Sequence, residues 1–429
     1  MLNLGLICPE LTGHLNPLTT LGLELKKRGH RVTVVARLDG RQRVEDAGIN
    51  FVPIGEKDFP LGEMQVTSAK LGKLRGLAAI RFTAGLLKRA ADAILKEAPA
   101  VAKKEGFDAM IVDQVSATGA TVADQMGLPH VLVCNAMAMN LDPDVPPGMT
   151  HWPYSPSAVG RARNAMGNAV LRWVAKPVIQ RIDRYRIDLG LPALGQTFTT
   201  GSALAEIAQQ PAFFDYPRRL LSRTFHYTGP WHHGGNVDPT AFPWDRLDGR
   251  RPLIYASMGT LQNRLDFIFS TIAEACAGLE AQVVISLGSR DQNAEALAAT
   301  FPGDPIVVPF APQLQLLERA SLVITHAGLN TALESLSHGL PMVAIPMAND
   351  QPGVASRLDW LGVAEVIQPT RLNAFRLRSA IFKVLSDPSY RENARQRQAE
   401  LLDLNGVARA ADIVEKAFTT RQPVLRDEA

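Results

Sequence analysis

The sequence has little of what marks a secreted, membrane-spanning or zinc-binding protein. Its 429 residues include only three cysteines, Cys8, Cys134 and Cys276, whose wide spacing favours neither a disulfide framework nor a zinc site. The first residues lack the basic segment and long apolar core of a signal peptide. No apolar run reaches the roughly 18 residues of a membrane-spanning helix. These absences predict a protein of the reducing cytoplasm and leave peripheral contact with a membrane surface open.

The chain also lacks an excess of charge of either sign. Its 45 Lys and Arg residues nearly balance 42 Asp and Glu residues, which gives a formal net charge of +3. A charge so close to balance argues against nucleic acid as a partner. With 46% hydrophobic and 20% charged residues, the composition is typical of a globular protein, and the length suffices for two domains with separate cores.

Short apolar runs alternate with helical patterns through both halves of the sequence. Continuous apolar runs of this length are typical of parallel strands buried on both faces. Neither half carries a G-x-G-x-x-G fingerprint after its first strand, which argues against a nicotinamide-dependent dehydrogenase. The predicted strands cover residues 2–8, 31–36, 109–113 and 130–135 in the first half, and 253–257, 282–288, 306–310, 322–325 and 342–346 in the second.

A segment rich in Gly and Pro, residues 227–252, separates the two halves and has little periodicity, which is typical of a domain linker. We therefore predict an α/β protein with two Rossmann-like domains that face each other across a cleft. The predicted parts are an N-terminal domain over 1–230, a linker over 231–251, a C-terminal domain over 252–404, and a helical tail over 405–429 that packs back on the first domain.

Polar residues cluster after one strand of the second half. His326 follows that strand, Asn330 and Thr331 open the next helix, and Glu334 lies four residues beyond Asn330 on the same helix face. Free backbone N–H groups and the helix dipole at such a helix start favour an anion. Taken singly, Asn330 is a helix cap and His326 a core histidine. Taken together, with the turn at 258–260 in the equivalent place of the same half, they predict a nucleotide-diphosphate site.

The segment over residues 310–351 resembles the donor-binding signature of the family-1 glycosyltransferases, which transfer sugar from a UDP-sugar to small acceptors on the GT-B fold. Segments 111–114, 256–262, 350–357 and 421–425 are similar to the carotenoid (zeaxanthin) glucosyltransferases of bacteria. The resemblance covers essentially the whole chain. The signature matches at Ala311, Pro312, Gln313, Leu317, His326, Gly328, Asn330, Glu334, Gly339, Pro341, Pro346, Asp350 and Gln351.

The resemblance implies a donor-binding role for these positions. Glu334 would accept hydrogen bonds from the ribose hydroxyls, whereas Asp350 and Gln351 would bind the donor sugar, and a Gln there indicates glucose. Phe310 and Leu329 stand where the plant form has Trp, which leaves the base open between uracil and thymine. The uracil edge and ribose would meet the segment 311–313, which includes Ala311 and Gln313, and the diphosphate would lie among Ser257, Gly259, Thr260, His326, Gly328, Asn330 and Thr331.

The resemblance also implies a catalytic pair in the first domain. The segment 13–17 resembles the family's base-bearing loop, which makes His14 the candidate general base and Asp113 its partner. A hydroxyl becomes a good nucleophile when its proton is removed, and a histidine with a near-neutral pKa suits that task. A carboxylate on the far ring nitrogen fixes the tautomer and stabilises the imidazolium. Without the resemblance, His14 is equally well explained as a helix-start residue bonded to nearby backbone.

The implied reaction is a single displacement that inverts the anomeric carbon and gives a β-glycoside from an α-linked UDP-sugar. The helix dipole and His326 would meet the charge of the leaving group, so we expect no catalytic metal and no cofactor besides the UDP-sugar co-substrate. Asp142 and Asp144 form a D-x-D sequence in a Pro-rich run, which we interpret as a turn rather than a manganese site.

Two apolar and basic segments, residues 71–97 and 168–182, bear on the acceptor. Such segments can lie on an anionic membrane surface, although ordinary domain helices with inward apolar faces explain them too. With the resemblance, they predict a lipophilic acceptor, a hydroxylated carotenoid such as zeaxanthin, and peripheral membrane association. The alternatives are a glycosyltransferase for flavonoids, macrolides or other small phenols and alcohols, a UDP-sugar epimerase, and an inactive nucleotide-sugar binder.

Overall fold

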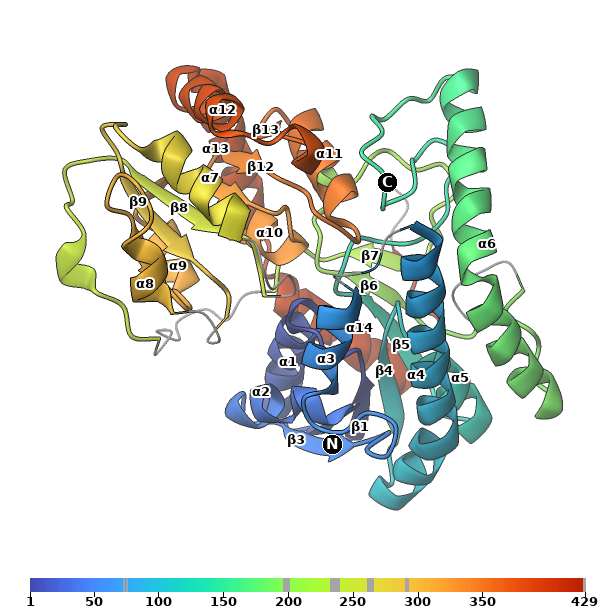
Figure 1. Ribbon diagram of the computed structural model, residues 1–429. Helices are drawn as coiled ribbons and strands as arrows, with labels where there is room; N and C mark the ends of the chain where they lie inside the picture. The colour runs from blue at the N-terminus through green and yellow to red at the C-terminus, as the bar shows by residue number, and fades with distance from the viewer. Residues whose placement is uncertain are drawn as a thin grey trace.

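The computed structural model contains two parallel sheets, one in each half of the chain, with helices on both faces (Figure 1). Part of the predicted linker, residues 232–239, lies outside the described residues, as do residues 261–262 and positions 72, 73 and 75 of the predicted basic helix. The structure describes residues 1–71, 74, 76–195, 201–231, 240–260, 266–289 and 293–426.

The N-terminal sheet has seven parallel strands, within the described residues, in the order β3-β2-β1-β4-β5-β6-β7. Its four predicted strands are confirmed to within one residue. The other three were not predicted, because β3 is only partly buried and the three-residue strands β6 and β7 each include a polar residue, Glu206 and His226, which breaks the apolar run. The strands are β1 (Asn3–Ile7), β2 (Arg31–Ala36), β3 (Asn50–Pro53), β4 (Ala109–Asp113), β5 (His130–Cys134), β6 (Glu206–Ala208) and β7 (Phe225–Tyr227).

The C-terminal sheet has six parallel strands, in the part of the chain that the structure describes, in the order β10-β9-β8-β11-β12-β13. The five strands predicted for this half are confirmed to within two residues, because helices cover both faces of the sheet and keep its strands apolar. The strands are β8 (Leu253–Ser257), β9 (Gln282–Ser286), β10 (Ile306–Val308), β11 (Ala320–Thr325), β12 (Met342–Ala344) and β13 (Ala364–Val366).

Six α-helices of the described chain belong to the N-terminal half. Three of them, α4, α5 and α6, pack together on one side of the sheet (Figure 1). The predicted basic helix falls on α3 and α4, and the second basic segment lies within α6. Among the described residues, no helix is both long and apolar enough to cross a membrane. The helices are α1 (Thr12–Lys27), α2 (Arg41–Asp46), α3 (Glu63–Leu71), α4 (Gly76–Glu105), α5 (Ala117–Met126) and α6 (Ala158–Asp188).

The remaining helices follow the C-terminal strands, except for the last one, which returns to the N-terminal half. There α14 packs against α1 and β5, and the Arg28 guanidinium donates to Asp412 at 2.6 Å and to Glu415 at 2.7 Å. The helices are α7 (Asp266–Cys276), α8 (Ala294–Ala298), α9 (Gln313–Leu317), α10 (Leu329–Ser337), α11 (Gln351–Trp360), α12 (Ala374–Ser386), α13 (Pro388–Leu402) and α14 (Gly406–Thr420).

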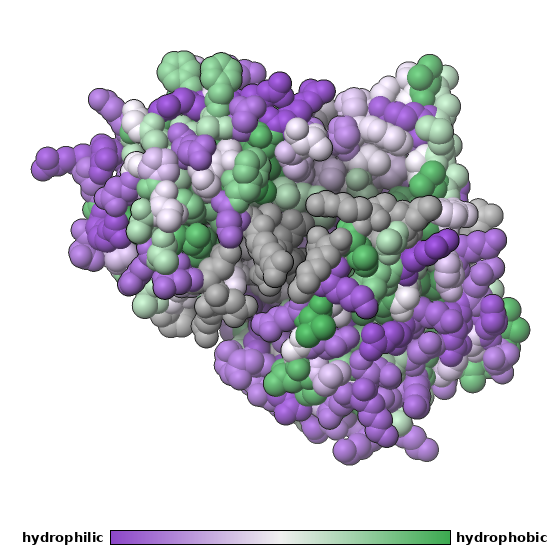
Figure 2. Space-filling view, in the orientation of Figure 1, coloured by the Kyte–Doolittle hydropathy of each residue, from purple (hydrophilic) through white to green (hydrophobic). Residues whose placement is uncertain are grey.

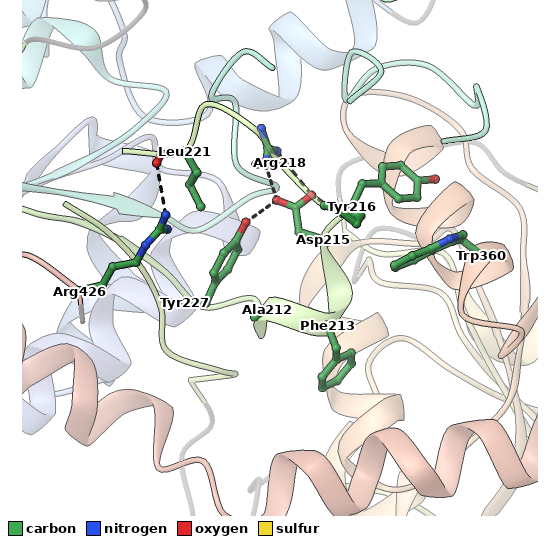
Figure 3. Close-up of a pocket in the computed structure, with 10 residues that line it drawn as sticks. Ala212, Phe213, Asp215, Tyr216, Arg218, Leu221, Tyr227, Trp360 and Arg426 are labelled. Atoms are coloured by element: carbon green, nitrogen blue, oxygen red, sulfur yellow. Dashed lines mark hydrogen bonds and ion pairs between the residues drawn. The ribbon is translucent and has the colours of Figure 1, made fainter. Parts of the chain in front are cut away.

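A buried ion pair joins the two halves. Arg357 of α11 donates to Oδ1 of Asp215, in the segment between β6 and β7, at 2.7 Å, and both side chains are only 1% exposed. On the other side of the carboxylate, Oδ2 accepts hydrogen bonds from Arg218 at 2.6 Å and from the Tyr227 hydroxyl at 2.8 Å (Figure 3). Burial alone would raise the pKa of Asp215, but Arg357 and Arg218 outweigh it and lower the pKa to about 2.

Candidate active site

The predicted catalytic pair lies at the carboxyl ends of two paired strands. Strand β1 ends at Ile7 and α1 begins at Thr12, so His14 lies in the first turn of that helix. Its Nδ1 atom lies 2.8 Å from Oδ2 of Asp113, the last residue of β4. Because β1 and β4 pair in parallel, their carboxyl ends meet at one edge of the sheet. The fold thus brings together two residues that are far apart in the sequence.

The Asp113 carboxylate is 1% exposed and is held by two further donors. Nδ2 of Asn135, just past β5, donates to Oδ2 at 2.7 Å, and the backbone N–H of Val115 donates to Oδ1 at 2.9 Å. An ionised carboxylate only accepts hydrogen bonds, so Nδ1 of His14 carries the proton in this contact. Nε2 is then the basic nitrogen of the imidazole.

The charges around His14 favour its protonated form. Burial opposes the imidazolium, but the charge of Asp113, the hydrogen bond to it, and the carboxylates of Asp350 and Glu10 outweigh burial. Together they raise the pKa of His14 above its ordinary value. A base with this environment holds an abstracted proton well, which is what general-base catalysis requires.

Across the cleft, the turn between β11 and α10 carries His326. The imidazole lies between two glycines, since a Cβ atom added at Gly259 or Gly328 would lie 2.7 or 2.6 Å from its Nε2 atom. Ala327 next to it has a φ of 62°, which is uncommon for a residue with a Cβ, and its N–H donates to Oγ1 of Thr325 at 3.1 Å. Strained backbone of this kind concentrates at functional sites.

The charge state of His326 differs from that of His14. Burial lowers the pKa of His326 to about 4, although a backbone contact with Ser257 partly opposes the shift. The ring is therefore neutral near pH 7. It can offer a diphosphate a hydrogen bond rather than a positive charge, while the helix dipole of α10 supplies the electrostatic part.

The side chain of Asn330, in the first turn of α10, forms hydrogen bonds to the N-terminal half. Its Nδ2 donates to the Gly13 carbonyl at 3.2 Å, and its Oδ1 accepts from Nε2 of Gln209 at 2.8 Å. The side chain predicted for the diphosphate is thus engaged by the N-terminal half. The anion donors left at this helix start are the backbone N–H groups of the first turn, together with the hydroxyl of Thr331.

A group of hydrogen-bonded side chains surrounds Gln313, at the positions predicted for the ribose. Nε2 of Gln313 donates to a carboxylate oxygen of Glu334 and, at 3.3 Å, to Oγ1 of Thr331. Its Oε1 accepts from the buried Tyr255 hydroxyl at 3.1 Å. Burial raises the pKa of Glu334 to about 7, with the Gln313 bond opposing the shift. A carboxyl group placed this way becomes a strong acceptor when it ionises against donor hydroxyls.

Asp350 and Gln351 lie where α11 begins. Oδ2 of Asp350 accepts from the backbone N–H of Met137 at 3.1 Å, so this carboxylate contacts the N-terminal half. Oε1 of Gln351 accepts from the backbone N–H groups of Met347 and Ala348, at 2.8 and 2.9 Å, and thereby shapes the loop before the helix.

The other predicted donor residues lie around the same edge of the C-terminal sheet. Ser257 is the last residue of β8, and Gly259 and Thr260 follow it in the turn. Phe310 and Ala311 connect β10 to α9, and Ala311 packs against the domain core. This edge therefore gathers the predicted donor positions opposite His14.

Two residues of this region were missed by the sequence reasoning. Asn135, which contacts Asp113, and Gln209, which contacts Asn330, each follow directly after a short strand. Neither belongs to a motif. The one available signal was a polar residue immediately past an apolar strand, where the carboxyl edge of a parallel sheet lies.

The D-x-D aspartates are committed to other contacts. Oδ2 of Asp142 accepts from the backbone N–H groups of Arg219 and Leu220, at 2.6 and 2.8 Å. Oδ1 of Asp144 accepts from Arg161 at 3.3 Å. These bonds fasten the loop to the N-terminal half, as a structural turn would.

A pocket of about 390 Å³ lies beside the buried Asp215 pair (Figure 3). Tyr216 and Trp360 line one side of it, and Tyr227 and Arg426 line another. The predicted donor and catalytic positions are not among the described residues that line it. It belongs to the junction of the two halves rather than to the cleft at His14.

Known proteins resemble the chain over its whole length. The family model described as "UDP-glucoronosyl and UDP-glucosyl transferase" matches residues 65–399. The zeaxanthin glucosyltransferase of Pantoea ananas is 31% identical over 439 aligned residues, which cover 99% of this chain and 98% of that protein. Among solved structures, the glycotransferase of kitacinnamycin has a TM-score of 0.73 at 25% identity, over 97% of this chain and 98% of its own. The glycosyltransferase VinC in complex with dTDP has a TM-score of 0.70 at 19% identity, over 97% and 100%, a likeness of fold.

Proposed function

The chain belongs to the UDP-glucoronosyl and UDP-glucosyl transferase family and has the GT-B fold, and we propose that it glucosylates a hydroxylated carotenoid such as zeaxanthin. The donor in this proposal is UDP-glucose, and the product is a β-glucoside formed by one inverting displacement without a catalytic metal. The observation that carries the proposal is the contact across the cleft. Gly13, next to the base His14, accepts a hydrogen bond from Asn330 at the start of the donor helix.

The proton step follows from the His14 environment. With Nδ1–H donated to Asp113, Nε2 of His14 removes the proton of the acceptor hydroxyl as that oxygen attacks C1 of glucose. The bond from C1 to the UDP oxygen breaks, and its electron pair leaves with the diphosphate. The proton stays on His14, where the Asp113 carboxylate stabilises the imidazolium. Attack from the side opposite the leaving group inverts C1.

The leaving diphosphate is stabilised at the start of α10. The first-turn N–H groups, the dipole of the helix and the neutral His326 ring act together there on the charge that develops on the leaving oxygen. Glu334 accepts from the ribose hydroxyls, and Asp350 and Gln351 bind hydroxyls of glucose. The resemblance of this sequence to zeaxanthin glucosyltransferases supports glucose as the sugar.

The acceptor assignment is supported by an exposed apolar stripe on α6. Val159, Met166, Val170 and Trp173 share one helix face and are between 56% and 80% exposed. Apolar residues gather along this edge of the molecule (Figure 2). The same helix also carries exposed basic residues, Lys176 and Arg184.

An apolar stripe accompanied by cations suits an anionic bilayer, from which a carotenoid would have to be drawn. The other predicted basic segment contributes less to such a surface. On α4 the residues Ala91, Leu95 and Ala98 are buried, because this helix packs against α5 and α6. Peripheral membrane binding is therefore proposed for α6.

The test supplies UDP-glucose together with zeaxanthin in anionic liposomes, or with soluble flavonoid and macrolide alcohols, and identifies products and UDP by chromatography. We expect a zeaxanthin β-glucoside, activity that survives EDTA, and sedimentation of the protein with the liposomes. UDP release that requires no acceptor would favour an epimerase or hydrolase. Transfer to the soluble alcohols alone would support a glycosyltransferase but would contradict a carotenoid as its acceptor.

A matched pair of variants isolates the membrane surface. Val170→Glu with Trp173→Glu should abolish liposome binding, while Phe375→Glu on α12, where the native side chain is 79% exposed, should not. Transfer to a soluble acceptor should persist in both proteins. Liposome binding that persists in the α6 variant would contradict the proposed surface.

A further inference from the structure

The segment 13–17, which carries His14 and is termed the base segment, lies at the start of α1 and contains a carbonyl that the helix leaves without its usual donor. In a regular α-helix the Gly13 carbonyl would accept from the N–H of residue 17, but that residue is Pro17, which has no N–H. The vacant acceptor is used by Nδ2 of Asn330, which reaches it across the cleft at 3.2 Å. A proline inside the first turns of α1 thus opens a hydrogen bond between the two halves.

The side-chain amide of Asn330 makes a second hydrogen bond to the N-terminal half. Its Oδ1 accepts from Nε2 of Gln209 at 2.8 Å, and this Nε2 also donates to the backbone carbonyl of Asn135 at 2.5 Å. The Asn135 side chain in turn donates to Asp113, the partner of His14. A closed ring of hydrogen bonds therefore links the base, its carboxylate and the start of α10.

Two backbone carbonyls fix the direction of two of the three side-chain amides in the ring, those of Gln209 and Asn330. The Asn135 carbonyl can only accept, so Gln209 must present its NH₂ group to it. The Gly13 carbonyl can only accept as well, so Asn330 must present Nδ2 to it and turn Oδ1 toward Gln209. Gln209 is 2% exposed, so water does not substitute easily for a lost donor.

We propose that Gln209 is a positioning residue that holds α10 and the base segment in one register, so that a donor bound at α10 and an acceptor hydroxyl bound at His14 lie at the distance that transfer requires. This inference rests on the proposed function, because it assumes that α10 binds the donor diphosphate. Gln209 touches neither reactant. It acts through Asn330 on the donor side and through Asn135 on the catalytic side.

Three substitutions test the ring. Gln209→Leu removes the donor, Gln209→Glu places a carboxylate against two oxygen acceptors, and Pro17→Ala supplies an N–H that competes for the Gly13 carbonyl. In the ligand-free protein, exchange of the His14 and Leu15 amides, which both donate to Leu11, should become roughly two- to tenfold faster in the two Gln209 variants. With donor and acceptor present, kcat should fall on the order of 10²-fold, with UDP affinity close to that of the wild type. Pro17→Ala should also lower kcat.

Gln210→Leu is the matched control. Gln210 is adjacent, 0% exposed, and accepts from the Ala138 N–H within the N-terminal half. This variant should lose stability but keep wild-type exchange at His14 and Leu15. Equal exchange and equal kcat in Gln209→Leu and Gln210→Leu would overturn the inference. A wild-type protein that fails to bind UDP or to transfer glucose would overturn the proposed function instead, and the exchange comparison would still decide the role of Gln209.

Discussion

At the scale of single residues, the proposed proton transfer depends on the 2.8 Å contact between His14 and Asp113. His14→Ala should lower turnover by roughly 10²- to 10⁴-fold, the range for a lost general base. UDP affinity, measured by calorimetry, should barely change, because the donor residues lie in the other half. Asp113→Asn should act in the same direction with a smaller loss, since the remaining amide oxygen can still accept one of the hydrogen bonds made to the carboxylate. Near-normal turnover in His14→Ala would assign the proton transfer to another group.

The raised pKa of Glu334 predicts a pH dependence of nucleotide binding. The carboxyl, with a pKa of about 7, is mostly protonated at pH 6 and mostly ionised at pH 8. Ribose hydroxyls donate to the ionised form, so UDP binding must release the proton at the lower pH. UDP affinity should therefore be roughly tenfold weaker at pH 6 than at pH 8, as one unit below and above the pKa implies.

The matched control for this prediction is Glu334→Gln, which keeps the shape of the side chain but cannot titrate. Its UDP affinity should be weaker at pH 8 than that of the wild type. Any pH dependence left in this variant belongs to the phosphate itself. If calorimetry gives the wild type and the variant the same pH profile, Glu334 does not carry the ribose contact.

Sequence alone could identify the residues that belong to motifs, but not those that serve them. His14 and Asp113 were predicted from segments that resemble family loops, and the fold places them in contact. Asn135 and Gln209 were missed because a lone polar residue after a short strand has many possible partners. Asn330 was predicted for the diphosphate, whereas its side chain bonds to Gly13 and Gln209. Which partner a side chain takes is decided by tertiary placement.

At the scale of elements, the turns after β8 and β11 form a clamp on the His326 ring. Gly259→Ala would place a Cβ 2.7 Å from that ring and strain a φ of 77°. We expect the ring to be displaced and UDP affinity to fall by roughly 10- to 100-fold, the effect of losing a hydrogen bond to a charged group. Isothermal calorimetry with UDP measures the change.

Gly278→Ala is the control that distinguishes a clash with His326 from backbone strain at a glycine of positive φ. Gly278 has a similar φ of 74°, but the nearest atom to an added Cβ is a side-chain nitrogen of Arg378 at 3.7 Å. This control should lose about 1–2 kcal/mol of stability from the left-handed conformation and keep its UDP affinity. A comparable loss of UDP affinity in both variants would mean that Gly259 matters for the backbone rather than for His326.

The sequence predicted a strand or helix more clearly when more of its residues are buried. Strands such as β4 and β8 are buried along their whole length, and their apolar runs indicated them clearly. Strands β6 and β13 each contain a glutamate, Glu206 and Glu365, within three residues and give no such run. Only residues 168–182 of the 31-residue α6 were singled out from the sequence, because much of the apolar surface of this helix faces outward and does not mark a buried face.

At the scale of the whole molecule, the alternation of strands and helices predicted two facing α/β halves, but not what fixes them together. Arg357 and Asp215 are 142 positions apart and belong to no common motif. Met137 and Phe214, from the N-terminal half, are buried within the core of the C-terminal half. Such contacts join residues that are far apart in the sequence, so composition and local periodicity contain no signal for them.

The buried ion pair at the junction of the two halves leads to a last prediction. Replacing Asp215 should cost more folding stability than replacing Arg357. Asp215→Asn leaves two buried guanidinium groups, Arg357 and Arg218, without their carboxylate, and should cost about 3–5 kcal/mol. Arg357→Met leaves Asp215 bonded to Arg218 and Tyr227, so its cost should be smaller, about 1.5–3 kcal/mol.

Because the folded pKa of Asp215, about 2, lies below its unfolded value, its stabilisation is complete above about pH 4 and is lost as the pH falls toward 2. Urea unfolding at pH 7 and at pH 3 should therefore show the gap between the wild type and Asp215→Asn narrowing at the lower pH. An Arg357→Met protein less stable than Asp215→Asn, or a gap that does not change with pH, would show that the carboxylate is not what holds the two halves together.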